Sequence, residues 1–165
     1  MELGLRGKTA LVTGASKGIG KGVAEALAEE GCNLHLVART SGDLERIASD
    51  IRSRHNVAVQ FHAADLSKPD NIVTIIEACA NADILVNNAG AIPHGTLEQI
   101  DDAKLRDVWD LKLFGYINLT RGLYAVMKDR GAGVIVNIIG AAGLFPSHDY
   151  YAGAGANAAL SSITA

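Results

Sequence analysis

Three glycines in the segment 13–20, which reads TGASKGIG, have a spacing that suits phosphate binding. The segment follows an apolar run, 9–12 (TALV), that predicts a buried strand, and it leads into a stretch, 19–30, whose apolar residues have helical spacing. Glycines at a strand-to-helix turn let the backbone approach a phosphate closely. The free N–H groups and the dipole of the helix start then favour the phosphate's negative charge. The sequence therefore predicts that this loop binds a dinucleotide.

Composition indicates a single globular domain, residues 1–165, of 165 residues with 48% hydrophobic side chains in short separated runs. No run approaches the roughly 18 apolar residues of a membrane span, and the start of the chain lacks the features of a signal peptide. The net charge of −3 provides no basic surface for nucleic acid. We expect a cytoplasmic protein with no membrane or nucleic-acid partner. The two cysteines and the histidines show no metal spacing, so we expect buried thiols and no metal site.

Strands and helices are predicted to alternate along the chain. Strands are expected at 9–13, 33–38, 57–62, 84–87 and 134–139. Helices are expected at 18–30, from 40 to 54, from 69 to about 80, within 101–130, and from 149 onward. Thr40 with Asp43, and Ser67 with Asp70, have the spacing of capping boxes. This order predicts an α/β fold, a doubly wound parallel sheet whose sites lie beyond the carboxyl ends of the strands.

Motifs at the ends of the first, third and fourth strands occur in a specific combination. They are the glycine loop at 13–20, Asp65-Leu66, and Asn87-Asn88-Ala89-Gly90. From about Gly7 to its end, the chain resembles the short-chain dehydrogenase/reductase family. The resemblance implies a Rossmann fold, bound NAD(H) or NADP(H), and hydride exchange between an alcohol and a carbonyl compound. By resemblance, Asp65 and Leu66 lie along the adenine, and residues 88–90 pass the adenosine ribose.

The choice of cofactor can be argued from charge. An NAD site needs a carboxylate after the second strand, where this chain has Ala38 followed by Arg39. A guanidinium can bind a 2′-phosphate with paired hydrogen bonds, and Lys17 adds a second cation, so we predict NADP(H) over NAD(H). The alternative is that both are ordinary surface cations. The expected cofactor-binding residues are Gly14, Ser16, Lys17, Gly18, Ile19, Gly20, Arg39, Asp65, Leu66, Asn88, Ala89 and Gly90.

The catalytic positions of the resembling family are substituted. In the family, a Ser follows the fifth strand, a Tyr and a Lys begin the next helix, and an Asn lies in the preceding long helix. Here the Ser position is Gly140, the Tyr position Gly153, the Lys position Asn157 and the Asn position Lys112. The family's Lys and Asn have traded places. We interpret this as a compensated exchange that moves the cation to the opposite wall, with chance drift as the alternative.

Tyr150 is the candidate proton donor because it lies three residues before Gly153, on the same face of a helix. A second alignment register places Tyr150 directly on the family's Tyr and Ala154 on its Lys. Otherwise the tyrosines line a substrate entrance without proton transfer. Tyr151 is expected to pack, and nothing obvious replaces the missing Ser. The candidate catalytic residues are therefore Tyr150, Lys112 and Asn157.

Two functions from different classes remain open. The first is an NADP(H)-dependent oxidoreductase with a rearranged active site acting on a small carbonyl or alcohol substrate. The second is a catalytically inactive dinucleotide-binding protein, either a redox sensor or a scaffold. The long helix is a subunit interface in the resembling family, so a homo-oligomer is expected. The chain ends inside an expected helix, which we interpret as truncation.

Overall fold

The computed structural model describes residues 3–164. Its central sheet contains five parallel strands in the order β3-β2-β1-β4-β5. The strands are β1 (Thr9–Thr13), β2 (Asn33–Ala38), β3 (Val59–Ala63), β4 (Ile84–Asn87) and β5 (Val134–Asn137). The order reverses direction between β1 and β4, which is the switch point where ligands bind in such sheets. The predicted doubly wound α/β fold is confirmed.

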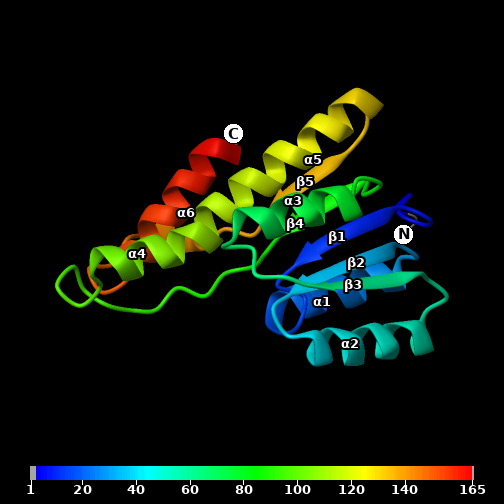
Figure 1. Ribbon diagram of the computed structural model, residues 1–165, viewed down its shortest axis with the longest axis horizontal. Coiled ribbons are helices and arrows are strands. Elements are labelled where there is room, and N and C mark those ends of the chain that lie inside the picture. The colour runs from blue at the N-terminus through cyan, green and yellow to red at the C-terminus, as the bar shows by residue number, and fades with distance from the viewer. Residues whose placement is uncertain (1–2, 165) are drawn as a thin grey trace.

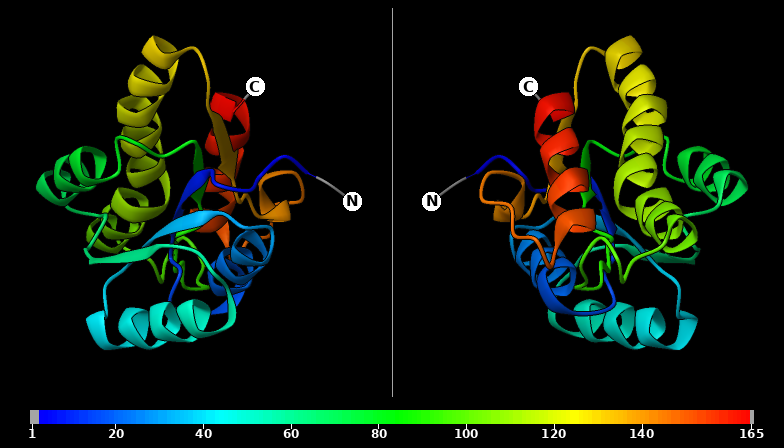
Figure 2. Two further views of the ribbon diagram at one scale, coloured as in Figure 1. Left: turned by 90° about the vertical axis from the view of Figure 1, so that its right-hand side faces the viewer. Right: turned by 90° about the vertical axis from the view of Figure 1, so that its left-hand side faces the viewer.

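Helices connect the strands and cover the sheet, as Figures 1 and 2 show. They are α1 (Gly18–Glu29), α2 (Ser41–Arg54), α3 (Pro69–Ala78), α4 (Asp102–Trp109), α5 (Tyr116–Arg130) and α6 (Tyr151–Thr164). A π-helical segment, η1 (Asp110–Gly115), joins α4 to α5, and a short 3₁₀ turn, η2 (Ala141–Gly143), follows β5. Within residues 3–164, no helix combines the length and apolar character that crossing a membrane requires.

Alternating side chains of the strands divide the core between the two faces of the sheet. Ala10 and Val12 of β1 pack with α1 and α2, whereas Leu11 between them packs with α3 and α5. Successive strand residues point to opposite faces, so a parallel sheet covered on both sides needs a continuous apolar run. A third cluster joins η1 to α6 through Leu113, Tyr116 and Leu160. Because the five strands are parallel, their carboxyl ends lie along one edge of the sheet.

Several predicted boundaries and caps were wrong. The long helix predicted within 101–130 is interrupted by η1, the third strand begins at Val59, and the fifth strand ends at Asn137. Thr40 is the N-cap residue of α2, as predicted, but its side chain makes no capping hydrogen bond, and Asp43 pairs with Arg46. The cap of α3 is Lys68, not Ser67.

The failure of the second capping box has a local cause. The amide of Ser67 donates to the Asp65 carboxylate at 3.0 Å, and the Asn71 side chain donates to the Asp65 carbonyl at 3.0 Å. Asp65 therefore organises the turn before α3, and the serine is drawn into that turn instead of into the helix start.

Candidate active site

The loop after β1 has the close backbone contacts that its glycines predict. Gly14 and Gly18 have φ values of +65° and +55°, a left-handed conformation that favours glycine. A Cβ at Gly20 would lie 2.3 Å from the Gly14 carbonyl oxygen, so no other residue fits there. At Gly18 a Cβ would meet nothing within 4 Å, so this part of the loop faces open space. The loop thus has a tightly fixed base and an accessible outer edge.

The end of β4 holds that base in place. The Thr13 hydroxyl accepts from the backbone amides of Asn88 and Ala89 at 2.9 and 3.0 Å. The Asn88 side-chain amide donates to the carbonyls of Thr13 at 3.0 Å and Gly14 at 3.3 Å. The sequence predicted that Asn88 and Ala89 belong to the site. In the structure these residues also lock the glycine loop onto the adjoining strand.

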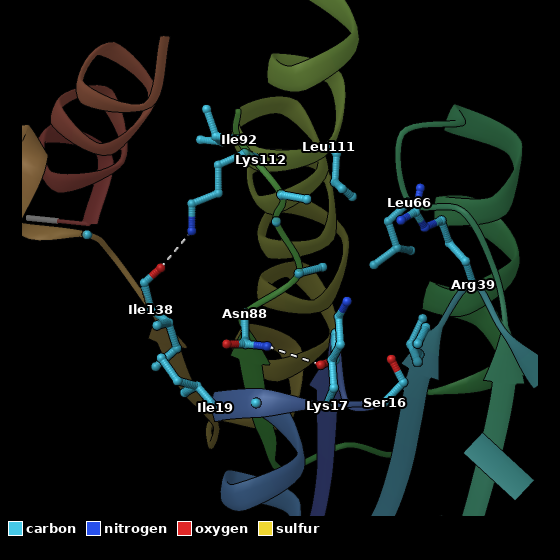
Figure 3. A pocket seen from close by; sticks show the side chains of 18 of the residues that line it. Ser16, Lys17, Ile19, Arg39, Leu66, Asn88, Ile92, Leu111, Lys112 and Ile138 are labelled. Atoms are coloured by element: carbon cyan, nitrogen blue, oxygen red, sulfur yellow. Dashed lines mark hydrogen bonds between the residues drawn. The ribbon is translucent and has the colours of Figure 1, made fainter. Parts of the chain in front are cut away.

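A cleft of about 580 Å³ runs along the carboxyl edge of the sheet (Figure 3). It is lined by ten of the predicted cofactor-binding residues, namely Gly14, Ser16, Lys17, Gly18, Ile19, Arg39, Leu66, Asn88, Ala89 and Gly90. Gly20 lies beneath the loop, and Asp65 is adjacent to Leu66; neither is among the lining residues. The candidate catalytic residues Lys112, Tyr150 and Asn157 line the same cleft. The topology therefore brings together residues that span most of the chain.

At the β2 end of the cleft, Arg39 is exposed and lines the cleft together with Leu66 (Figure 3). Burial alone would raise the pKa of Asp65, but the hydrogen bonds from Ser67 and the charges of Arg39 and Lys68 hold that pKa below its usual value. Lys17 is also exposed on the glycine loop. This end of the cleft is therefore the cationic one, although Asp65 is a charge partner of Arg39.

Lys112 crosses the other end of the cleft from η1 toward β5 (Figure 3). Only 8% of it is exposed, and its Nζ donates to the Ile138 carbonyl at 2.8 Å and to the Tyr116 hydroxyl at 2.7 Å. Nζ also lies 4.3 Å from the centroid of the Tyr116 ring. Burial lowers the pKa of Lys112 from 10.5 to about 8 and raises that of the Tyr116 hydroxyl. Lys112 is thus a buried amine that loses its proton as the pH rises through about 8.

Glycine at position 90 makes room for that lysine. A Cβ on Gly90 would lie 2.9 Å from Cδ of Lys112. The π-helical turn that carries Lys112 is a local irregularity of a kind that is frequent at functional sites. The side chain of Lys112 can therefore extend from η1 past Gly90 into the cleft.

Asn157 fills the space beside Gly140. Its Oδ1 accepts from the Gly140 amide at 2.9 Å, and its Nδ2 would lie 2.9 Å from a Cβ built on Gly140. The side-chain amide therefore stands where a side chain at position 140 would begin. Asn157 is only 2% exposed, and its side chain occupies the space that glycine leaves at position 140.

Tyr150 fills the space beside Gly153 in the same way. It immediately precedes α6, and a Cβ on Gly153 would lie 2.2 Å from Cε1 and 2.7 Å from the hydroxyl of Tyr150. A bridge to Gly95 holds its backbone, and the His94 ring lies at a centroid distance of 4.6 Å. The Tyr150 ring thus occupies the position that a side chain at 153 would take. Tyr151 instead donates to the Ile100 carbonyl at 2.9 Å, a packing role as predicted.

Two partners of Lys112 were missed by sequence reasoning. Tyr116 lies four residues after Lys112 on the same helical face, a spacing that was available as a signal. The Ile138 carbonyl had no signal, because a backbone acceptor is selected by the fold. Ser147 and His148, the polar residues that follow position 140 most closely before Tyr150, are exposed and are not among the residues that line the cleft.

Comparison with known proteins identifies the architecture. The sequence profile of the short chain dehydrogenase family matches residues 8–165. The chain belongs to this family. It is 32% identical over 150 residues to an uncharacterized oxidoreductase, YvaG, of Bacillus subtilis, an alignment that covers 90% of this chain and 57% of that protein. It is 34% identical over 148 residues to D-beta-hydroxybutyrate dehydrogenase of Cupriavidus necator, covering 87% and 57%.

Solved structures show the same fold. L-sorbose reductase of Gluconobacter frateurii, in complex with NADPH and L-sorbose, superposes with a TM-score of 0.94 at 33% identity. That superposition covers 99% of this chain and 64% of the reductase. A short-chain dehydrogenase of Sphingobium yanoikuyae, in complex with NADPH, has a TM-score of 0.90 at 30% identity, covering 94% and 63%. The chain therefore spans somewhat more than half the length of these family members.

Proposed function

We propose that this chain provides the cofactor-binding and catalytic part of an NADP(H)-dependent oxidoreductase that acts on a small carbonyl or alcohol substrate. One observation carries the proposal. The cleft over the glycine loop is also lined by Lys112, Asn157 and Tyr150. Each of these side chains packs against a glycine: Lys112 against Gly90, Asn157 against Gly140 and Tyr150 against Gly153. Family membership and the solved relatives in complex with NADPH support the same function.

The residues present fit a dinucleotide. A Cβ on Gly14 would lie within 2.8 Å of Asn88, and Gly18 faces open space, so the loop combines a close-packed base with exposed backbone at the start of α1. Residues 14–20 would hold the pyrophosphate through backbone amides. When bound, the nicotinamide supplies hydride transfer to or from the substrate carbon. Ala38 and Arg39 favour a 2′-phosphate over a free hydroxyl, since no carboxylate stands at the end of β2.

Each catalytic residue is assigned a role that its surroundings support. Asn157 donates a hydrogen bond from Nδ2 to the substrate oxygen, because that atom lies beside the space that a serine at 140 would occupy. Tyr150 transfers the proton through the hydroxyl that lies over Gly153. Lys112 supplies the positive charge that a tyrosine needs to ionise near neutral pH, with its ammonium oriented by Ile138 and Tyr116.

The second candidate is a dinucleotide-binding protein without turnover. Glycine at positions 140 and 153 favours it, because both family side chains are absent there. The contacts around these glycines favour the enzyme, since Asn157 and Tyr150 occupy the spaces that the missing side chains leave. If the protein catalysed no reaction, selection would not have matched Asn157 to Gly140 and Tyr150 to Gly153.

A kinetic assay on the natural protein separates the two candidates. NADPH binding is measured by fluorescence, and turnover is measured by loss of reduced-nicotinamide absorbance with a panel of ketones, aldehydes and 3-oxoacyl esters. Turnover that Tyr150→Phe abolishes, with cofactor affinity retained, is expected for the enzyme. Binding without turnover on every substrate supports the inactive protein instead. Failure to bind either nicotinamide dinucleotide would reject both.

We also propose a homo-oligomer. Phe114 and Tyr124, which belong to η1 and α5, expose 48% and 57% of their surfaces, and such aromatic area is typical of interfaces. Light scattering at several concentrations tests this. A monomer at every concentration, with Phe114→Ser giving the same mass, would contradict it.

A further inference from the structure

Two histidines and a cysteine converge in a second site, on the face of the sheet that α3 covers. His35 lies on β2, His62 lies on β3, and Cys79 directly follows α3. Because β2 and β3 pair with His35 opposite Gln60 and Val37 opposite His62, the two histidines are diagonal neighbours on one face. We propose that His35, His62 and Cys79 bind a zinc ion. The proposal does not depend on the function of the cleft.

The donor atoms have the separations of a small coordination site. His35 Nδ1 lies 3.0 Å from His62 Nε2, and Cys79 Sγ lies 3.8 Å from the same nitrogen. All three donor atoms lie within 4.8 Å of one another. Tetrahedral zinc, with Zn–N near 2.0–2.1 Å and Zn–S near 2.3 Å, separates its ligand atoms by about 3.4–3.6 Å. The 3.0 Å and 3.8 Å separations are close to these values.

The two imidazole rings lie in the protein interior. His35 is 3% exposed and His62 is half-buried. The polar side chain of Asn81 lies close enough to His35 to act on its ring, and outer polar partners of this kind orient metal-ligating histidines.

Cys79 completes the site as the soft ligand. It is fully buried and forms no disulfide. On binding, the S–H bond breaks, a Zn–S bond forms, and the proton passes to water. Mixed imidazole and thiolate donors suit zinc better than magnesium or calcium, which prefer oxygen.

The same contacts allow a simpler arrangement, a hydrogen bond shared between two core histidines. The ring planes differ by 21° with centroids 5.3 Å apart, so the two nitrogens face each other along that bond. This pair alone gives no role to Cys79, which comes from a third element and approaches the same His62 nitrogen. Convergence of all three donors on one small volume favours the metal site.

Cobalt titration tests the proposal directly. Untagged natural protein is treated with a chelator, and Co²⁺ is added, because a Co²⁺–thiolate bond gives a charge-transfer band in the near ultraviolet. One equivalent is expected to produce the band, zinc is expected to displace the cobalt, and zinc is expected to raise the melting temperature. Cys79→Ser is expected to abolish the band, whereas the matched variant Cys32→Ser, at the other buried cysteine, is expected to keep it.

Two further variants guard against a folding defect at the buried cysteine. His62→Asn is compared with His55→Asn, since both histidines are half-buried. Asn81→Ala, at an exposed position, is expected to weaken zinc binding about 10- to 100-fold without unfolding the protein. No charge-transfer band in the wild-type protein would overturn the proposal. The proposal would also be overturned if folded His62→Asn and Asn81→Ala proteins bound zinc as tightly as His55→Asn does.

Discussion

Replacing Lys112 with methionine tests whether this lysine supplies the active-site cation. Methionine keeps most of the side-chain volume and removes the ammonium. If that charge assists proton transfer by Tyr150, kcat/KM is expected to fall by about 10²- to 10⁴-fold, the usual contribution of a positioned acid–base system. The assay is NADPH-dependent reduction of whichever panel carbonyl the wild-type protein accepts.

The variant is expected to remain folded, and the structure shows why. Lowering the pKa of Lys112 from 10.5 to about 8 means that burial disfavours its charged form by about 3 kcal/mol, and methionine removes that penalty. The variant loses the hydrogen bonds to Tyr116 and Ile138, each worth about 1.5–3 kcal/mol for a charged donor. The Tyr116 hydroxyl lies 3.5 Å from the Ile138 carbonyl, so these two groups can pair with each other.

The opposing terms nearly cancel, so the free energy of unfolding is expected to change by less than about 2 kcal/mol. Lys128→Met, at an exposed position on α5, is the matched control and is expected to keep full activity. If folded Lys112→Met has kcat/KM within about threefold of the wild-type value, the assignment of Lys112 as the cation is refuted.

Other perturbations test neighbouring parts of the argument. Because the protonated form of Lys112 is the active one and its pKa is about 8, kcat/KM is expected to be flat at lower pH and to fall as pH rises through that value; an unchanged profile in Lys112→Arg would contradict this. Gly153→Ala is expected to displace the Tyr150 ring and to abolish turnover with NADPH affinity retained, whereas Gly155→Ala, whose Cβ would lie 3.2 Å from a tryptophan ring, is expected to be mild; equal activities would refute the packing argument. Arg39→Ala is expected to weaken NADPH binding about 10- to 100-fold and to leave NADH binding unchanged, as calorimetry would measure; parallel losses would show that the guanidinium does not select the 2′-phosphate.

The strand framework was predictable because buried parallel strands require apolar runs. The segments 9–13, 33–38 and 84–87 were confirmed at the predicted residues, and the glycine loop follows the first of them. The π-helical turn at 110–115 was not predictable from periodicity. It arises where the long helix passes close to the loop after β3, with a Cβ on Gly115 only 3.1 Å from the Leu66 carbonyl.

The side chains that line the cleft were predictable from motifs, whereas the backbone groups that they contact were not. The residue types at 112 and 157 suggested an exchange from the sequence alone, but the backbone partners Ile138 and Gly140 could not be predicted. The His35, His62 and Cys79 cluster was missed for a related reason. Its members are separated by 27 and 17 residues, far from the short spacings of common metal motifs, and the register of β2 with β3 brings them together.

Lys112 and Asn157 line the same cleft, and the proposed exchange makes their identities interdependent. Restoring lysine at position 157 alone would bring a second ammonium toward the first, and restoring asparagine at 112 alone would leave the cleft without a buried cation. Either half-step should be worse than both together, so the double reversal is expected to recover activity that each single reversal loses. An evolutionary route that changes one of these positions at a time is therefore expected to pass through a less active protein. The exception is a route in which a third residue type at one position supports activity with either lysine or asparagine at the other.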